Sequence, residues 1–136
     1  MDVIKRYQSQ HKIIQTLCKQ LISLGTINEV TLDVDVVLKI FTTLDNVLSL
    51  HLQSEDESLY PQLLAHKDPE IRSISAAIQT ELLATAQAYD AYRNKYSTKE
   101  SMQSNPTDFV DDTKQIVEAL LTRINKEEAE LYSLFD

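Results

Sequence analysis

The sequence is poor in the residues that make tight turns and crosslinks. Its 136 residues include one glycine, three prolines, one cysteine and no tryptophan. So little glycine and proline leaves few places for tight turns and indicates long helices joined by few connections. The single cysteine, Cys18, excludes an internal disulfide and favours a reducing compartment. We expect Cys18 to be a small core residue.

Long apolar runs and positive charge are also scarce. No segment approaches the length of a membrane span, and the start MDVIKRYQS lacks the apolar stretch of a signal peptide. We therefore expect a cytoplasmic protein that does not contact a membrane. The net charge of −8 argues against a nucleic-acid partner, because such binding depends on Lys and Arg that neutralise phosphates. The length predicts a single domain over residues 1–136.

Apolar residues recur at helical spacing in four segments. They predict helices over about residues 3–24, 32–64, 69–96 and 106–134. Gly25 is a plausible stop for the first helix, and Pro61 predicts a kink or break in the second. Asp68 and Asn105 each precede a proline and are expected to be N-caps, and the polar stretch 97–107 is expected to be a loop. The sequence therefore predicts an all-α, up-down-up-down antiparallel four-helix bundle.

The segment HLQSEDESLYP, from His51 to Pro61, carries the most chemistry. His51 and Glu55 stand four residues apart, so on a helix their side chains share one face. An imidazole and a carboxylate there form half of a site for iron, manganese or zinc. The same face is otherwise apolar, and an ionisable pair buried without a partner would be unfavourable.

Further candidate ligands lie on the other predicted helices. At a rise of about 1.5 Å per residue, five ionisable residues fall at similar heights in the bundle. These residues are His11, His51, Glu55, Glu81 and Glu127. We predict that they meet at one metal site, although His11 can also be an ordinary helix histidine and Glu81 and Glu127 can lie in water. His66 is expected in a loop outside the site.

Three segments carry a family resemblance: RYQSQHKII with His11, HLQSEDESLYP with His51 and Glu55, and RINKEEAELYSL with Glu127. In this order and spacing, they resemble the hemerythrin-like, HHE cation-binding domain family. The resemblance covers nearly the whole chain. It implies a non-haem iron pair bridged by carboxylates, with an open coordination position that binds dioxygen or a related species.

Two positions depart from the family's pattern. Arg123 stands where the fourth helix normally has histidine, and Glu81 stands where the third helix normally supplies one. Arginine offers no lone pair to a metal. In one interpretation the remaining ligands hold one ion or an unequal pair. In the other, Arg123 bonds Glu81 or Glu127 in a metal-free network; a third possibility is that Arg123 extends outward to solvent.

The chain is predicted to bind iron for oxygen or iron sensing, storage or handling, and not to be an enzyme. A metal-free regulatory or interaction bundle, with Arg123 in the vacant centre, is the first alternative, and a diiron oxidase or peroxidase is the second. The sequence lacks a glycine-rich phosphate loop and an evident nucleophile–base arrangement. Tyr60 and Tyr132, which end two related motifs, are expected to pack at the bundle end, where either hydroxyl can reach the site as a hydrogen-bond donor.

Overall fold

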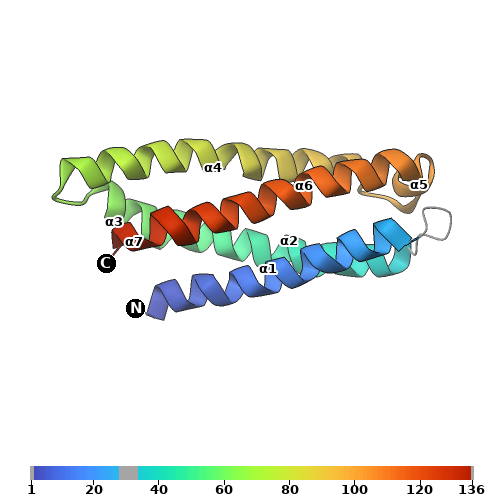
Figure 1. Cartoon of the computed structure of the whole chain (residues 1–136), viewed down its shortest axis with the longest axis horizontal. Coiled ribbons are helices and arrows are strands. Elements are labelled where there is room, and N and C mark those ends of the chain that lie inside the picture. Colours follow the sequence, from blue (N-terminus) through green and yellow to red (C-terminus); the bar gives the residue numbers. More distant parts are fainter. Residues whose placement is uncertain (1, 28–33, 136) are drawn as a thin grey trace.

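The computed structural model describes residues 2–27 and 34–135, which form a helical bundle (Figure 1). In chain order, the elements are α1 (Asp2–Ile27), α2 (Val34–Ser54), the π-helical turn η2 (Glu55–Leu59), α3 (Tyr60–Leu64), α4 (Pro69–Lys95), α5 (Lys99–Gln103), α6 (Pro106–Lys126), the π-helical turn η3 (Glu127–Leu131) and α7 (Tyr132–Phe135). These ranges contain no strand, so the all-α fold class is confirmed. The same ranges contain no helix that is long and apolar enough to cross a membrane.

Side-chain caps begin the later helices where the sequence predicts them. The Asp68 carboxylate accepts a hydrogen bond from the Glu70 amide (2.9 Å) at the start of α4. The Asn105 side chain accepts one from the Asp108 amide (3.2 Å) at the start of α6. In both helices proline occupies the first turn, where its missing N–H leaves no helical hydrogen bond unmade.

Three local predictions need correction. Gly25 does not stop the first helix. Helix α1 continues through Ile27, and Gly25 does not have a positive φ. Pro61 lies in the first turn of α3, directly after η2, so the expected break is a change of hydrogen-bonding pattern within a helical segment. The expected loop 97–107 contains the short helix α5, which a capping box between Thr98 and Ser101 begins. Residues 32 and 33, the predicted start of the second helix, lie outside the described residues.

The core consists of two apolar clusters. The larger one lies between α1, α2, α4 and α6, in the part of the bundle near α5, and includes Cys18, as expected. The smaller one lies near α3 and α7 and contains Tyr7, Leu59, Tyr60, Leu63, Ile78, Leu82, Leu131 and Tyr132. Along α1, along α2 with η2, and along α6 with η3, buried ionisable residues lie between the residues of the two clusters. It follows that these residues are enclosed by apolar packing on both sides.

Candidate metal centre

The buried layer is built from four of the five predicted ligands. His11 lies on α1, His51 on the last turn of α2, Glu55 at the start of η2 and Glu127 at the start of η3. All four residues are at most 2% exposed. Helical periodicity brings them inward, because each occupies a position in the apolar stripe of its own helix.

Their polar atoms converge on one point. Nε2 of His11 lies 3.1 Å from Nε2 of His51 and 2.8 Å from Oε1 of Glu127. The same Glu127 oxygen lies 3.2 Å from Nε2 of His51, which in turn is 3.3 Å from Oε1 of Glu55. His11, His51 and Glu127 thus present two imidazole nitrogens and one carboxylate oxygen to a common centre.

Two residues that the sequence did not single out fix the orientation of the imidazoles. Oε1 of Gln10 lies 2.7 Å from Nδ1 of His51, and Oε1 of Glu128 lies 3.2 Å from Nδ1 of His11. Both oxygens accept hydrogen bonds, so each Nδ1 carries the proton and each Nε2 is directed at the centre. This is the arrangement that orients metal-binding histidines. Adjacency to His11 and Glu127 was the only sequence signal for Gln10 and Glu128.

The two buried carboxylates differ in their electrostatics. Burial, followed by the nearby charge of Glu127, raises the pKa of Glu55 to about 10. Burial would raise the pKa of Glu127 as well, but its short polar contacts with the imidazoles of His11 and His51 hold it well below its usual value. Two carboxylates this close in an apolar layer do not both ionise readily unless a cation balances them.

The donor set fits a metal ion. Oε1 of Glu55 is buried and, among the described residues, has no hydrogen-bond partner. The ligand atoms of His11, His51 and Glu127 lie 2.8, 3.1 and 3.2 Å apart, so all three could contact one ion.

Arg123 completes one side of the layer. The residue is 9% exposed, and its Nε donates to Oε2 of Glu127 (3.3 Å). One terminal nitrogen donates to the carbonyl of Leu82 (2.9 Å), and the other lies 3.6 Å from Oε1 of Glu55. The guanidinium therefore points inward and bonds Glu127, so the interpretation in which it extends to solvent is wrong. Its positive charge lies beside both carboxylates.

Glu81 does not join the cluster. Its side chain is 58% exposed and pairs with Nζ of Lys126 (2.9 Å) on the surface. The buried face of α4 runs through Ser75, Ile78 and Leu82, and the prediction that Glu81 shares this face is wrong. One residue corresponds to about 100° around a helix, which turns Glu81 outward. Within the described residues, α4 reaches the cluster through the carbonyl of Leu82.

The two related motifs share an unusual backbone feature. Each changes to π-helical hydrogen bonding at its glutamate, over Glu55–Leu59 in η2 and Glu127–Leu131 in η3. Single π-helical turns inside α-helices are frequent at functional sites. Tyr60 and Tyr132 follow these turns and pack in the smaller core cluster, as expected.

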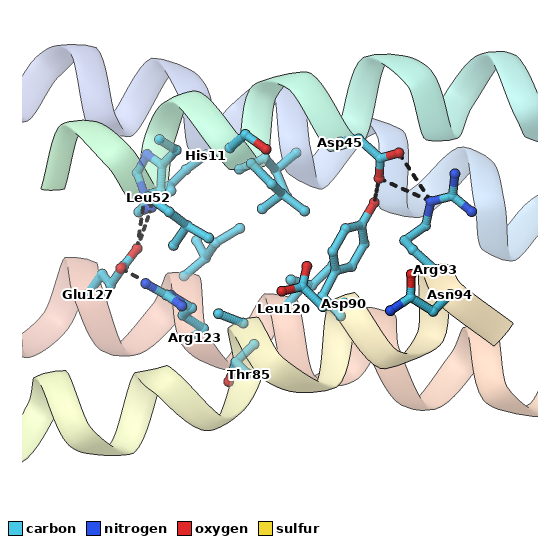
Figure 2. A pocket seen from close by; sticks show the side chains of 17 residues that line it. His11, Asp45, Leu52, Thr85, Asp90, Arg93, Asn94, Leu120, Arg123 and Glu127 are labelled. Atoms are coloured by element: carbon cyan, nitrogen blue, oxygen red, sulfur yellow. Dashed lines mark hydrogen bonds and ion pairs between the residues drawn. The ribbon is translucent and has the colours of Figure 1, made fainter. Parts of the chain in front are cut away.

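A cavity of about 350 Å³ gives access to the cluster (Figure 2). Side chains of α1, α2, α4 and α6 line it. At one end lie His11, Arg123 and Glu127, and at the other Asp45 accepts hydrogen bonds from Tyr89 (2.5 Å) and Arg93 (3.0 Å). Leucine and isoleucine side chains line the part between. A small molecule can therefore approach the histidines without displacing the core.

The fold and this donor set agree with one family in the comparisons with known proteins. Residues 2–135 match the family model of the hemerythrin HHE cation-binding domain. No curated protein and no solved structure gave a match. A match over nearly the whole chain, together with a buried His, His and Glu cluster at the motif positions, establishes that the chain belongs to the hemerythrin HHE cation-binding domain family.

Proposed function

We propose that this protein binds one non-haem iron ion through His11, His51 and Glu127. The observation that carries the proposal is the convergence of their three ligand atoms within one buried layer. Two histidines and one carboxylate, with further positions open, are typical of non-haem Fe(II) sites. The additional oxygen of Glu55 makes the set richer in oxygen, which favours iron or manganese over softer metals.

Arg123 supports one ion over a pair. Its guanidinium lies 3.3 Å from Oε2 of Glu127 and 3.6 Å from Oε1 of Glu55. A second metal cation bridged by both carboxylates would have to share them with a permanent positive charge in a region of low dielectric. The same charge argues against a diiron oxidase or peroxidase.

We propose that the protein senses, stores or handles iron or dioxygen and is not an enzyme. A bound iron ion would supply a Lewis-acidic centre with open positions for dioxygen or a related small ligand. The chain's own residues hold and protect this centre. Gln10 and Glu128 orient the imidazoles, Arg123 balances the carboxylates, and the two apolar clusters limit access to the cavity of Figure 2.

We propose the same bundle topology and cellular location that the sequence predicts. Helices α1, α2, α4 and α6 alternate in direction in Figure 1, which supports one up-down-up-down four-helix domain over residues 1–136. We also propose a cytoplasmic location, which the single cysteine favours, because disulfides are rare in reducing compartments.

A metal-free regulatory bundle is the second candidate function. It is supported by the bonds of Arg123 to Glu127 and to the carbonyl of Leu82, which form a charge-assisted network without an ion. In that case, the two Nε2 atoms at 3.1 Å would share a proton in place of a metal.

Elemental analysis separates the two candidates. We expect protein purified without chelator, or loaded anaerobically with Fe(II) and desalted, to carry about one iron ion per chain. His51→Ala should lower this content by roughly tenfold or more, because it removes a ligand. The control is His66→Ala, since His66 lies outside the cluster, is half-buried, and accepts a hydrogen bond from the amide of Asp68 (3.0 Å). Wild-type protein without stoichiometric iron after loading would overturn the iron proposal and favour the metal-free bundle.

A further inference from the structure

The phenol oxygen of Tyr132 lies inside the cluster of ligand atoms. It is 3.1 Å from Nε2 of His11, and it donates a hydrogen bond to Oε2 of Glu55 (3.1 Å). Oε1 of Glu127 is 3.5 Å away. These separations are similar to those among the two histidines and Glu127, so the phenol oxygen is placed as a further ligand atom would be.

The π-helical turn η3 is what aims Tyr132 at the cluster. The amide of Tyr132 donates to the carbonyl of Glu127, five residues earlier. In an uninterrupted α-helix, residues five apart point in directions that differ by roughly 140°. The wider turn brings Glu127 and Tyr132 to the same face. The backbone thus departs from α-helical geometry at η3, and this departure places both side chains in the layer.

Ring packing holds the phenol in this position. The Tyr132 ring stacks on the His11 imidazole at 5.5 Å between centroids and on the Tyr7 ring at 5.8 Å. Tyr7 is itself anchored by a hydrogen bond from its hydroxyl to the carbonyl of Ser54 (3.0 Å). Tyr132 is 4% exposed. A side chain so confined is preorganised, so little conformational entropy is lost when it binds an ion.

We propose that Tyr132 is a direct ligand of Fe(III) at this site, alongside His11, His51 and Glu127. This inference rests on the iron site of the proposed function and goes beyond the ligands found in the sequence motifs. On coordination, the phenol O–H bond breaks and the oxygen donates its electron pair to the ion. The phenol proton is released to solvent. An anionic oxygen favours the harder ferric ion.

The charges around Tyr132 are consistent with a phenol that loses its proton only when Fe(III) is bound. Burial, followed by the charges of Glu127 and Glu55, raises the pKa of Tyr132 far above its usual value. A ferric ion in the layer would stabilise the phenolate, because its positive charge would oppose these effects.

Tyr60 provides a matched control. It follows the other π-helical turn, and its amide likewise donates to the carbonyl of Glu55. It is 2% exposed, but its hydroxyl has no hydrogen-bond partner among the described residues. Tyr60 and Tyr132 therefore share backbone setting and burial, and they differ in whether the phenol oxygen contacts the cluster.

The test is spectroscopic. Full-length protein is loaded with ferric nitrilotriacetate and desalted, and its iron content, visible absorption and resonance Raman spectrum are measured. We expect a phenolate-to-Fe(III) charge-transfer band and the corresponding tyrosinate vibrations in wild-type protein and in Tyr60→Phe. Tyr132→Phe should lose both signals, retain its helical circular dichroism, and bind Fe(III) roughly 10- to 100-fold more weakly.

Each outcome bears on the inference. Stoichiometric iron without tyrosinate vibrations in wild-type protein, or vibrations that survive in Tyr132→Phe, would overturn the role of Tyr132 and leave the iron site standing. Loss of the vibrations in Tyr60→Phe, but not in Tyr132→Phe, would mean that Tyr60 is the ligand and would overturn the inference for Tyr132. Wild-type protein that binds no iron under these conditions would overturn both the iron site and this inference.

Discussion

The Nε2 atoms of His11 and His51 face each other at 3.1 Å, although 40 residues separate these histidines in the chain. A hydrogen bond on the far side fixes each ring, because Nδ1 of His11 donates to Glu128 and Nδ1 of His51 donates to Gln10. Two imidazole lone pairs directed at one another in an apolar layer repel unless a proton or a metal ion lies between them. The space between the two Nε2 atoms therefore suits a proton or a metal ion, and an oxygen of Glu127 lies beside it to balance the charge.

Substitution of Glu127 should change the iron content of the protein, and substitution of Glu81 should not. Glu127→Gln removes the negative charge of a buried, proposed ligand and leaves the size of the side chain nearly unchanged. We expect iron per chain to fall by roughly tenfold or more. Glu81→Gln should leave the iron content unchanged, since Glu81 is exposed and pairs with Lys126. Iron content after loading and gel filtration measures both. An equal loss in Glu81→Gln would mean that α4 turns a different face to the bundle interior.

The sequence predicted the fold class and the later helix starts because those features depend on local chemistry. The spacing of apolar residues predicts which face of a long helix is buried. Asp68 and Asn105 predict where α4 and α6 begin, because their side chains accept hydrogen bonds from amides of the first turn. The helix α5 escaped prediction because five residues are too few to show a helical period. Its signals were the capping pair Thr98 and Ser101 and the buried Met102.

The site was predicted well along the bundle axis and less well around it. Counting residues gave similar heights to His11, His51 and Glu127, which do meet. An error of one residue in the stripe of α4 was enough to misplace Glu81, since each residue turns the helix by about 100°. The contact of Tyr132 with His11 depends on a π-helical turn, and apolar periodicity assumes the α-helical repeat throughout.

Met102 should anchor the short helix α5. Its side chain is fully buried and packs in the larger core cluster. Met102→Ala leaves a cavity there, and we expect the free energy of unfolding to fall by about 2–5 kcal/mol. Urea-induced unfolding followed by circular dichroism measures the change. Gln103→Ala, at an exposed neighbour, should stay within about 0.5 kcal/mol of wild type; a similarly small effect of Met102→Ala would contradict the packing of α5.

Asp112 should contribute stability that is lost in acid. Hydrogen bonds from Lys95 (2.8 Å) and then Tyr96 (2.5 Å) lower the pKa of Asp112. A lowered folded-state pKa stabilises the protein above the unfolded value, near 3.9, and this contribution disappears as the pH falls through the folded value. Because Lys95 is exposed, Asp112→Asn should lower the free energy of unfolding at neutral pH by at most about 1 kcal/mol.

Urea unfolding at neutral and at strongly acidic pH tests this contribution. The difference between wild type and Asp112→Asn should shrink in acid, because the wild-type carboxyl is then protonated. Asp111→Asn, at the exposed adjacent position, controls for the loss of one negative charge from a chain of net charge −8. A difference for Asp112→Asn that is the same at both pH values would show that its carboxylate is not preferentially stabilised in the folded state.

Arg123 should matter most when no metal ion is bound. Arg123→Met leaves Glu127 buried without its guanidinium partner, and we expect this to lower the free energy of unfolding of chelator-treated protein by about 3–5 kcal/mol. Iron should reduce that loss, because the ion then supplies the balancing charge. Urea unfolding with EDTA and after iron loading gives the comparison. Arg93→Met is the matched control, since Arg93 pairs with Asp45 at the far end of the cavity and its loss should not depend on iron. An effect of Arg123→Met that is the same with and without iron would mean that the ion and the guanidinium do not share Glu127.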